Sequence, residues 1–407
     1  MEIIHDSKSS TLLPTTLDRP ESGEFLIRLQ STSPDEFINV SVPRIDSDLE
    51  LVKSSSVILR GYQSNHWQDG EFSNLKTKIN GKPKSIGYIF PISTISESNS
   101  IICDNQVVSL YALAAVWELL KSSELQKELP HIAWGETYIL SDFFRDDLVI
   151  AIYSPERIDT RPEVTKQMIS DFSITLADYK TYEYRNIDIK EKQQDDNFVT
   201  ERSIYLSPCS DDSKKPIFDY VKNHIAVAES TNCDPIVRFF LQYQFFELLM
   251  QTVFSGVIDE FRYKISNDSY VNDAWKTKEL VSKLSEKTSE SYRISRIFGF
   301  MLQKLGPETA NINESCKSLL KKLESQKNVD PKDYSESKIP YYKIRNLIFH
   351  GFASNSIEKN DISYICDAVA KAIYKLLLAF ESLSPYFELE NDVEEIGATR
   401  LQFNPNH

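Results

Sequence analysis

Residues 234–264 read DPIVRFFLQYQFFELLMQTVFSGVIDEFRYK, and this stretch decides the fold of the C-terminal half of the chain. Because an α-helix turns once in about 3.6 residues, side chains three, four or seven positions apart lie on one face. Large apolar side chains recur here at those spacings: Phe240, Tyr243, Met250, Phe254, Val257 and Phe261. The stretch therefore predicts a long helix whose aromatic face is buried in a helical bundle.

Downstream of this stretch the pattern stays helical. Apolar residues at helical spacing predict further helices at about 272–287, 289–305, 313–326, 340–350 and 361–384. Asn360 or Asp361 is expected to cap the last of them. We predict an all-α domain over 215–387, followed by an acidic tail at 388–407.

Upstream of residue 215, the spacing of the apolar residues is typical of β-strands. Short apolar or alternating runs predict strands at EFLIRLQ, FINVSV, SSVILRGY and SIGYIF, all between residues 24 and 100. Asn80-Gly81 predicts a two-residue hairpin turn, and Pro83 beside it favours an edge strand. The remaining elements expected in this half are a buried helix at 107–128, a strand at 147–155, a helix at 161–180 and a strand at 182–190.

Two polar stretches, EKQQDDNFVTE at 191–201 and SPCSDDSKKP at 207–216, separate the strand-rich part from the helical part. Residues 1–23 are rich in Ser, Thr and Pro without a period, and we expect a loosely ordered lead-in there. The predicted fold is thus α+β. A strand-rich α+β domain at 24–205, expected to act as a sensor or regulator, precedes an all-α helical bundle.

Composition fits a folded protein of two domains and excludes several functional classes. The 407 residues are 41% hydrophobic and 26% charged, which is ordinary for globular domains, and the chain is longer than a single core usually grows. The net charge is −14, but residues 214–345 carry 21 Lys and Arg against 17 Asp and Glu, so a mildly basic region lies beside an acidic remainder. No P-loop, dinucleotide-binding, zinc-protease or serine-hydrolase motif is present, so these chemistries have no support.

The cellular location is predicted from cysteines and apolar runs. Five scattered cysteines without a CxxC pair favour reduced thiols over disulfides or a zinc site. The start, MEIIHDSKSS, lacks the basic segment and apolar run of a signal peptide. The apolar run VVSLYALAAVWELL from Val107 is shorter than the ~20 residues that cross a bilayer. We expect a cytoplasmic protein without membrane contact, metal or cofactor.

One short predicted helix, PYYKIRNLIFHG, carries polar residues among apolar ones. Pro340 suits the first position of a helix and Gly351 the position just past its end. Asn346 and His350 are four residues apart and share a face, while Arg345 lies about 140° round from His350, within reach of its long side chain. Histidine exchanges protons near neutral pH and arginine stabilises phosphate charge, so the set suits phosphodiester cleavage without a metal.

This arrangement resembles the R-x4–6-H signature of the HEPN superfamily, with Arg345, a polar residue and then His350 in the last helices of an α-helical domain. RFFLQYQFFELL at 238–249 is similar to the aromatic-rich opening helix of many bacterial members, and the resemblance covers about 215–385. It implies a homodimer, formed through the C-terminal helical domain, in which two motif helices face each other. The two helices would then build one metal-independent RNA-cleaving site.

The resemblance also implies roles and partners. His350 is expected to transfer protons, Arg345 to stabilise the phosphate and the transition state, and Asn346 to position the phosphate or the imidazole. Such proteins act as toxins or anti-phage effectors that leave 2′,3′-cyclic phosphates, which implies an RNA substrate and a phage-derived or antitoxin-like trigger. HEPN toxins that are silenced by adenylylation carry a tyrosine two residues after the histidine. Phe352 occupies that position here, which argues against this mode of control.

Glu247 is expected to support the site. It interrupts the aromatic stripe of the long helix, one turn after Tyr243, which we group with it as a supporting residue. A buried carboxylate needs a partner, and Arg345 is the candidate. The alternative is that Glu247 reaches solvent past a loosely packed neighbour.

Three further interpretations stay open. Lys317, Lys321 and Lys322, on the helix expected at 313–326, are candidates to receive RNA phosphates, or they form only a solvated face. The HEPN-like bundle can also be a non-catalytic scaffold for dimerisation or binding. Finally, IDIK at 187–190 has the form of a metal-dependent nuclease strand, with Asp146 or Asp147 as a second ligand.

Overall fold

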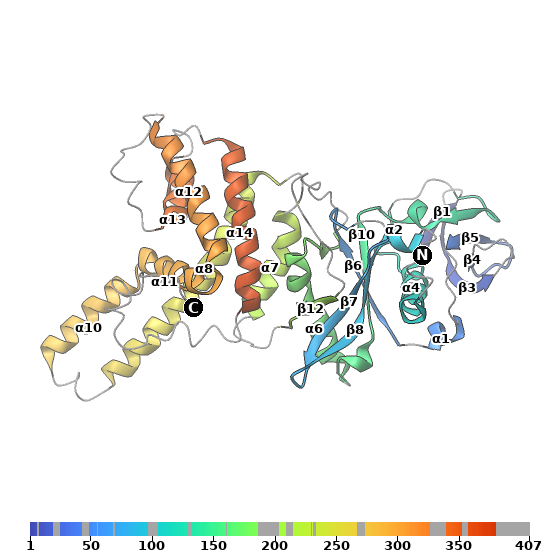
Figure 1. Ribbon diagram of the computed structural model, residues 1–407, viewed down its shortest axis with the longest axis horizontal. Coiled ribbons are helices and arrows are strands. Elements are labelled where there is room, and N and C mark those ends of the chain that lie inside the picture. The colour runs from blue at the N-terminus through green and yellow to red at the C-terminus, as the bar shows by residue number, and fades with distance from the viewer. Residues whose placement is uncertain are drawn as a thin grey trace. The chain divides into compact units, whose positions relative to one another are not determined.

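The computed structural model describes residues 1–5, 8–18, 25–42, 49–54, 56–67, 70–96, 105–127, 132–159, 161–185, 203–208, 215–228, 230, 233–266, 273–325, 339–351 and 357–379. The chain divides into two compact units. Unit 1 comprises Met1–Pro208 and Ile225–Asn232, and unit 2 comprises Cys209–His224 and Cys233–His407. Strands dominate the first and helices the second, so the fold is α+β as predicted (Figure 1).

Unit 1 contains a six-stranded sheet, a four-stranded sheet and a hairpin within its described part. The six-stranded sheet runs in the order β11 (Tyr182–Glu183), β6 (Ile58–Gln63), β10 (Leu148–Tyr153), β8 (Lys82–Pro91), β7 (Ser73–Ile79) and β12 (Ser203–Leu206). The four-stranded sheet runs β3 (Leu13–Asp18), β4 (Phe25–Gln30), β5 (Phe37–Val42) and β9 (Thr137–Ile139). The hairpin pairs β1 (Glu2–His5) with β2 (Lys8–Thr11). The helices are α1 (Leu49–Ser54), α2 (Ile92–Ser96), α4 (Gln106–Leu119), α5 (Leu140–Phe143), α6 (Pro162–Asp178) and the 3-10 turn η1 (Pro155–Arg157).

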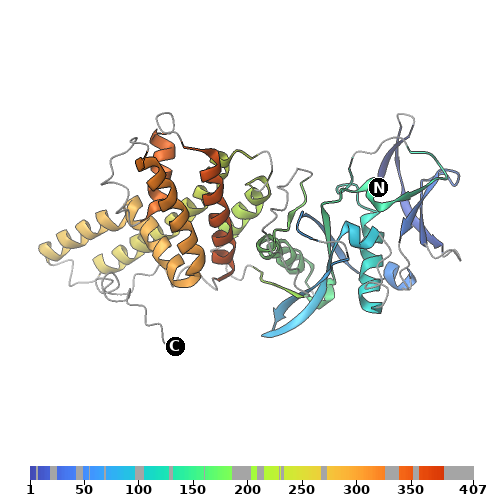
Figure 2. The ribbon, with the colours of Figure 1, turned by 45° about the horizontal axis from the view of Figure 1, so that its top comes forward.

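The core of unit 1 lies on both faces of β10, whose six residues LVIAIY are all buried. Alternate residues of the strand, such as Ile150 and Val149, enter two different clusters. One cluster joins β10 to α4 and the four-stranded sheet, and the other joins it to α6. Helix α4 thus lies between the two sheets (Figure 2), which explains why it is apolar all round its circumference.

The hairpin turn predicted at Asn80-Gly81 is confirmed, because β7 and β8 pair across it and both residues have positive φ, 51° and 76°. The edge position inferred from Pro83 is wrong for the strand as a whole, because β8 lies between β7 and β10. Pro83 pairs only with β7, since β10 pairs with β8 from Gly87 to Pro91 alone. The proline is tolerated because that end of β8 extends past its second neighbour.

Three other expectations for unit 1 have different outcomes. The loosely ordered lead-in expected at 1–23 is wrong for Glu2–His5, Lys8–Thr11 and Leu13–Asp18, which form β1, β2 and β3, and Met1, Ile3 and Leu12 are buried. These strands are short and rich in Ser and Thr, so they lack an alternating signal. The helix predicted at 161–180 is confirmed as α6. The strand predicted at 182–190 is present as β11, and residues 186–190 lie outside the described part of the chain.

Unit 2 is a helical bundle built around the long helix predicted from residues 234–264. Its described helices are α8 (Pro235–Ile265), α10 (Ala274–Lys287), α11 (Glu290–Leu305), α12 (Pro307–Ser325), α13 (Pro340–Gly351), α14 (Lys359–Ala379) and the part of α7 (Lys215–Ala228) that precedes Ile225. Helix α8 contacts α10, α11 and α14, and α12 packs against α13 and α14. Asp234 caps α8 by accepting a hydrogen bond from the Ile236 N–H, and Pro235 follows at the first helical position. The acidic tail expected at 388–407 lies outside the description.

The buried face of α8 matches the predicted one only in part, because Tyr243, Met250 and Val257 of the predicted stripe are buried. The fully buried residues on it include Phe239, Phe246, Met250, Val253 and Val257, whereas Phe254 is 39% exposed. Aromatic residues occur on two neighbouring faces of this helix, and both satisfy a spacing of three and four. Only the packing of α11 and α14 decides which of the two is buried.

Helix ends also differ from the sequence expectations. Gly351 is the last residue of α13 rather than the residue beyond it. Helix α14 begins at Lys359, so neither Asn360 nor Asp361 caps it. Asp361 instead lies in the first turn and forms an ion pair with Lys322 of α12. No helix in the described ranges combines the length and apolar character that a bilayer crossing requires.

Candidate functional site

Helix α13 carries the predicted motif and is anchored by its apolar residues. Tyr341, Ile344 and Ile348 are buried in the bundle. The Tyr341 ring lies 5.1 to 5.6 Å, centroid to centroid, from the rings of Phe239, Phe246 and Phe298. These buried residues fix the orientation of α13 about its own axis. Arg345 and Asn346 are consequently half-buried at the edge of the bundle. His350 is helical, but its side chain lies outside the description, as does Phe352.

Arg345 is the centre of a polar cluster at this edge, and its side chain is 16% exposed. Its Nη1 donates a hydrogen bond to Oδ1 of Asn346 at 2.9 Å, and its Nη2 lies 3.4 Å from Oε1 of Glu290. The guanidinium carbon lies 4.9 Å from the centre of the Tyr243 ring and 4.5 Å from that of Phe349. One hydrogen bond, one ion pair and two cation–π contacts therefore restrict the orientation of the guanidinium.

Glu290, the first residue of α11, was not predicted from the sequence. Its Oε1 accepts a hydrogen bond from the Tyr243 hydroxyl at 2.9 Å, and its Oε2 accepts one from the Tyr342 hydroxyl at 3.0 Å. A glutamate just after Ser289, which caps α11 through the Tyr292 N–H, has the sequence signature of an ordinary first-turn residue. Nothing local in the sequence distinguishes it from a solvent-facing glutamate.

The two tyrosines around Glu290 are held in their protonated form. Burial raises the pKa of Tyr243, and the bond to the Glu290 carboxylate raises it further. Burial, followed by smaller effects that include the Glu290 bond, raises the pKa of Tyr342 as well. Both phenols therefore remain hydrogen-bond donors across the physiological pH range.

The structure brings Glu247 and Tyr243 to Arg345, as the sequence suggested, but with unequal roles. Glu247 Oε1 lies 4.0 Å from Arg345 Nη2, and the Glu247 side chain is 46% exposed. It is therefore an outer, solvated partner rather than a buried one. Tyr243 is buried and contacts both Arg345 and Glu290.

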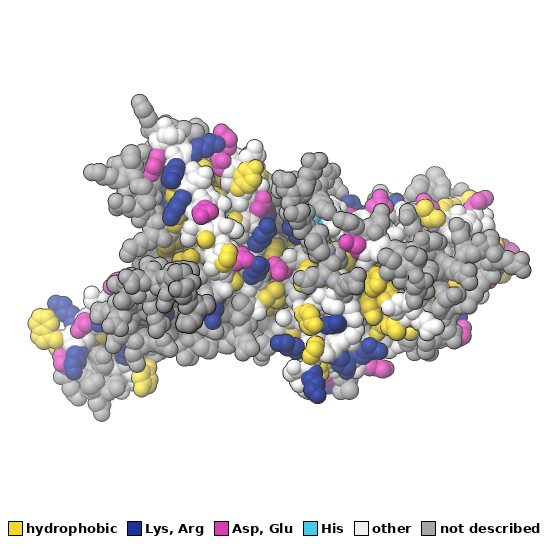
Figure 3. Space-filling view, viewed as in Figure 1, with side chains coloured by type: hydrophobic (Ala, Val, Ile, Leu, Met, Phe, Trp, Pro, Cys, Tyr) yellow, Lys and Arg dark blue, Asp and Glu magenta, His cyan; other side chains and the backbone are white. Residues whose placement is uncertain are grey.

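The three lysines proposed for RNA contact lie on α12 with different surroundings. Lys317 and Lys321 are exposed and four residues apart, so they share a face. Lys322 forms ion pairs with Glu358 and Asp361 at 3.0 and 2.9 Å, which neutralise its charge. Around α12 and α14, Figure 3 shows Lys and Arg side chains interspersed with Asp and Glu. Of the three lysines, Lys317 and Lys321 are thus the better candidates for phosphate contact, because carboxylates already pair with Lys322.

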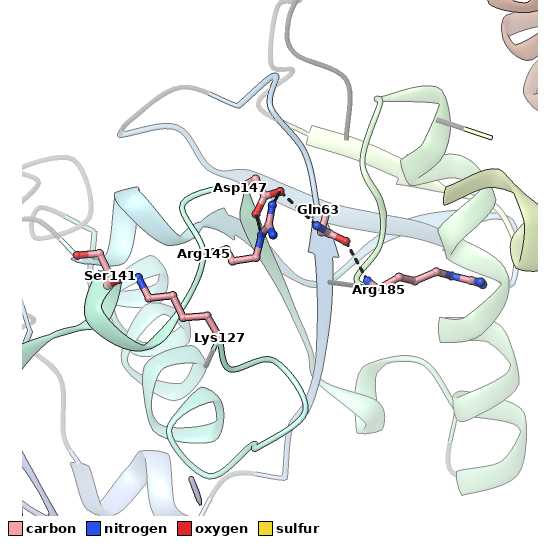
Figure 4. Close-up of polar contacts among 6 residues, drawn as sticks. All are labelled: Gln63, Lys127, Ser141, Arg145, Asp147 and Arg185. Atoms are coloured by element: carbon pink, nitrogen blue, oxygen red, sulfur yellow. Dashed lines mark hydrogen bonds and ion pairs between the residues drawn. The ribbon is translucent and has the colours of Figure 1, made fainter. Parts of the chain in front are cut away.

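The metal-site alternative rests on residues that the structure describes only in part. IDIK at 187–190 lies outside the described residues, whereas Asp146 is exposed and Asp147 is described. The Asp147 carboxylate accepts two bonds from Arg145, at 2.9 and 3.1 Å, and one from Gln63 at 3.2 Å (Figure 4). Gln63 in turn accepts a bond from the Arg185 N–H. Asp147 therefore already has a full set of partners, and no group of three or more His, Cys, Asp or Glu in the described part of the chain is placed to hold a metal ion.

Comparisons of this chain with protein-family models, with curated proteins and with solved structures find no match.

Proposed function

We propose that this protein is a metal-independent endoribonuclease of the toxin or anti-phage type. Arg345, Asn346 and His350 from two copies of the chain would form its composite site. His350 transfers the proton, Arg345 neutralises the phosphate, and Asn346 orients the phosphate or the imidazole. The strand-rich unit, over 24–205, recognises the trigger or keeps the nuclease inactive.

The observation that carries this proposal is the fixed orientation of the Arg345 guanidinium at the edge of the bundle. Asn346 accepts a hydrogen bond from Nη1, Glu290 forms an ion pair with Nη2 at 3.4 Å, and the ring centroids of Tyr243 and Phe349 lie 4.9 and 4.5 Å from the guanidinium carbon. A cation that is oriented before the substrate arrives can stabilise the phosphorane without further loss of rotational freedom. His350 lies five positions further along the same helix, about 140° round from Arg345, so the shared site relies on the reach of the long arginine side chain.

The surroundings of the motif also support a second copy. Phe349 is 48% exposed although it packs edge-on against Phe240, with ring centroids 4.6 Å apart. An exposed aromatic beside a polar cluster is typical of surfaces that meet another protein. A dimer in which two α13 helices meet would bury this ring and place two arginines and two histidines together.

A second function, that of a non-catalytic scaffold, is favoured by the acidic neighbours of Arg345. Glu290 and Glu247 both lie within 4.0 Å of its Nη2, so a phosphate has to compete with carboxylates for the guanidinium. In that function the cluster serves only to join α8, α11 and α13.

Purified protein incubated with total RNA in EDTA separates the two. The nuclease proposal predicts fragments with 2′,3′-cyclic phosphate ends from wild type, and at least a hundredfold less product from His350→Ala and from Arg345→Ala, since general acid–base help alone contributes about 10²–10⁴-fold. Equal cleavage by wild type and both variants would refute the assignment of these residues. Activity that EDTA abolishes would favour the metal-dependent alternative, and no cleavage by a dimeric wild type with any RNA or activator would favour the scaffold.

A further inference from the structure

Glu290 is the one carboxylate in the described part of the cluster that contacts two tyrosine hydroxyls and Arg345 together. Its three partners come from two other helices, Tyr243 from α8 and Tyr342 and Arg345 from α13. A glutamate in the first turn of a helix gains about 0.3–1 kcal/mol from the helix dipole while facing solvent. Glu290 instead turns toward the bundle, with 34% of its side chain exposed.

The two phenols determine how the carboxylate is oriented. Tyr243 donates to one oxygen and Tyr342 to the other, so the plane of the carboxylate is set by two hydrogen bonds at 2.9 and 3.0 Å. Charge-assisted bonds of this kind are about twice as strong as neutral ones. The oxygen bound by Tyr243 is also the one that faces Nη2 of Arg345. The direction of the Arg345–Glu290 contact is therefore imposed by the tyrosines and does not depend on substrate.

We propose that Glu290 is the positioning residue for Arg345 in RNA cleavage, an inference that rests on the nuclease function proposed above. The hydrogen bond to Asn346, the ion pair with Glu290 and the neighbouring rings of Tyr243 and Phe349 together restrict rotation of the guanidinium. Nε is buried without a partner among the described residues, so Nη1 and Nη2 are the nitrogens that would meet the phosphate of a bound RNA. Glu290 itself touches neither phosphate nor reacting atoms.

The charge of Glu290 determines which kinetic constant should change. A carboxylate beside Arg345 weakens the attraction between the arginine and a ground-state phosphate, so its removal should not weaken RNA binding. Removing it does release the guanidinium from its fixed orientation, and a misplacement of about 1 Å can cost around 10²-fold in rate. Loss of Glu290 should thus lower kcat and leave KM unchanged or slightly lower.

The test uses the full-length protein and RNA in EDTA, with kcat and KM measured for wild type, Glu290→Gln and Tyr342→Phe. We expect Glu290→Gln to lower kcat about 10–100-fold with KM no higher than that of wild type. Tyr342→Phe removes one of the two bonds that orient Glu290 while leaving its charge, and should lower kcat less. Glu308→Gln is the matched control, because Glu308 lies in the first turn of α12 in an ion pair with Lys375, outside the cluster. It should keep wild-type kcat and KM.

The possible outcomes are distinct. Wild-type kcat in a folded Glu290→Gln, a raised kcat, or a change in KM alone would overturn the positioning role while leaving the nuclease function standing. A raised kcat would identify Glu290 as a group that masks Arg345. If Glu290→Gln fails to fold, Tyr342→Phe decides, and wild-type kcat in that variant overturns the inference. A wild type that cleaves no RNA fails the proposed function, and this inference falls with it.

Discussion

Tyr341→Phe should stabilise the helical unit, although it removes a polar group from the centre of the bundle. Tyr341 is fully buried, and its hydroxyl has no hydrogen-bond partner within the described part of the chain. An unsatisfied buried polar group costs about 1–3 kcal/mol, whereas the dispersion attraction between one oxygen and a neighbouring atom is worth only about 0.1–0.2 kcal/mol. The free energy of unfolding should therefore rise by about 1 kcal/mol, which corresponds to about 2–4 °C in Tm for a unit of this size.

Tyr243→Phe is the matched control, because the same atom is deleted from a tyrosine that is equally buried but hydrogen-bonded. Its hydroxyl donates to Glu290, so its loss should destabilise the unit by about 1.5–3 kcal/mol. Urea unfolding of the full chain, followed by far-UV circular dichroism, measures both variants, since the helical unit dominates that signal. The reasoning is refuted if Tyr341→Phe is less stable than wild type, or if the two variants shift stability in the same direction. Tyr341→Ala should cost about 3–5 kcal/mol, because the whole ring is lost from the aromatic core.

Two further predictions concern a close backbone contact and a helix cap. Gly87→Ala should destabilise unit 1 by about 1–3 kcal/mol in thermal unfolding, because an added Cβ would lie 2.0 Å from the carbonyl oxygen of Ile152 on the paired strand β10. An unchanged Tm would contradict this prediction and would show that β8 can shift to make room for the added methyl group. The hydrogen bond from Lys359 to Asp234 and the cap bond at α8 hold the pKa of Asp234 below its ordinary value. The charged carboxylate therefore stabilises the fold at pH above about 4. This stabilisation is lost as the pH falls through the lowered pKa. Asp234→Asn should therefore be slightly less stable than wild type in urea unfolding at neutral pH, and the difference should close in acid; a difference that persists at low pH would contradict this.

Local patterns in the sequence predicted the type of many elements in both halves of the chain. Helix formation depends on neighbours within a few positions. The spacing of apolar residues at 234–264 was therefore sufficient to predict α8, and the apolar run from Val107 was sufficient to predict α4. Asn80-Gly81 was sufficient for the hairpin, since both residues tolerate the positive φ that a tight turn demands. The placement of Arg345, Asn346 and His350 on one helix followed from Pro340 and the spacing alone.

Only the tertiary structure decided what these elements meet. The buried face of α8, the central position of β8 despite Pro83, and the pairing of β3 with β4 all depend on packing partners outside the element itself. Glu290 shows the reason most clearly. A glutamate after a capping serine is the same in sequence whether it faces water or a guanidinium, and its role at Arg345 arises because α8, α11 and α13 converge at that point. Periodicity is a property of a single helix, whereas a polar cluster exists only where several helices pack together.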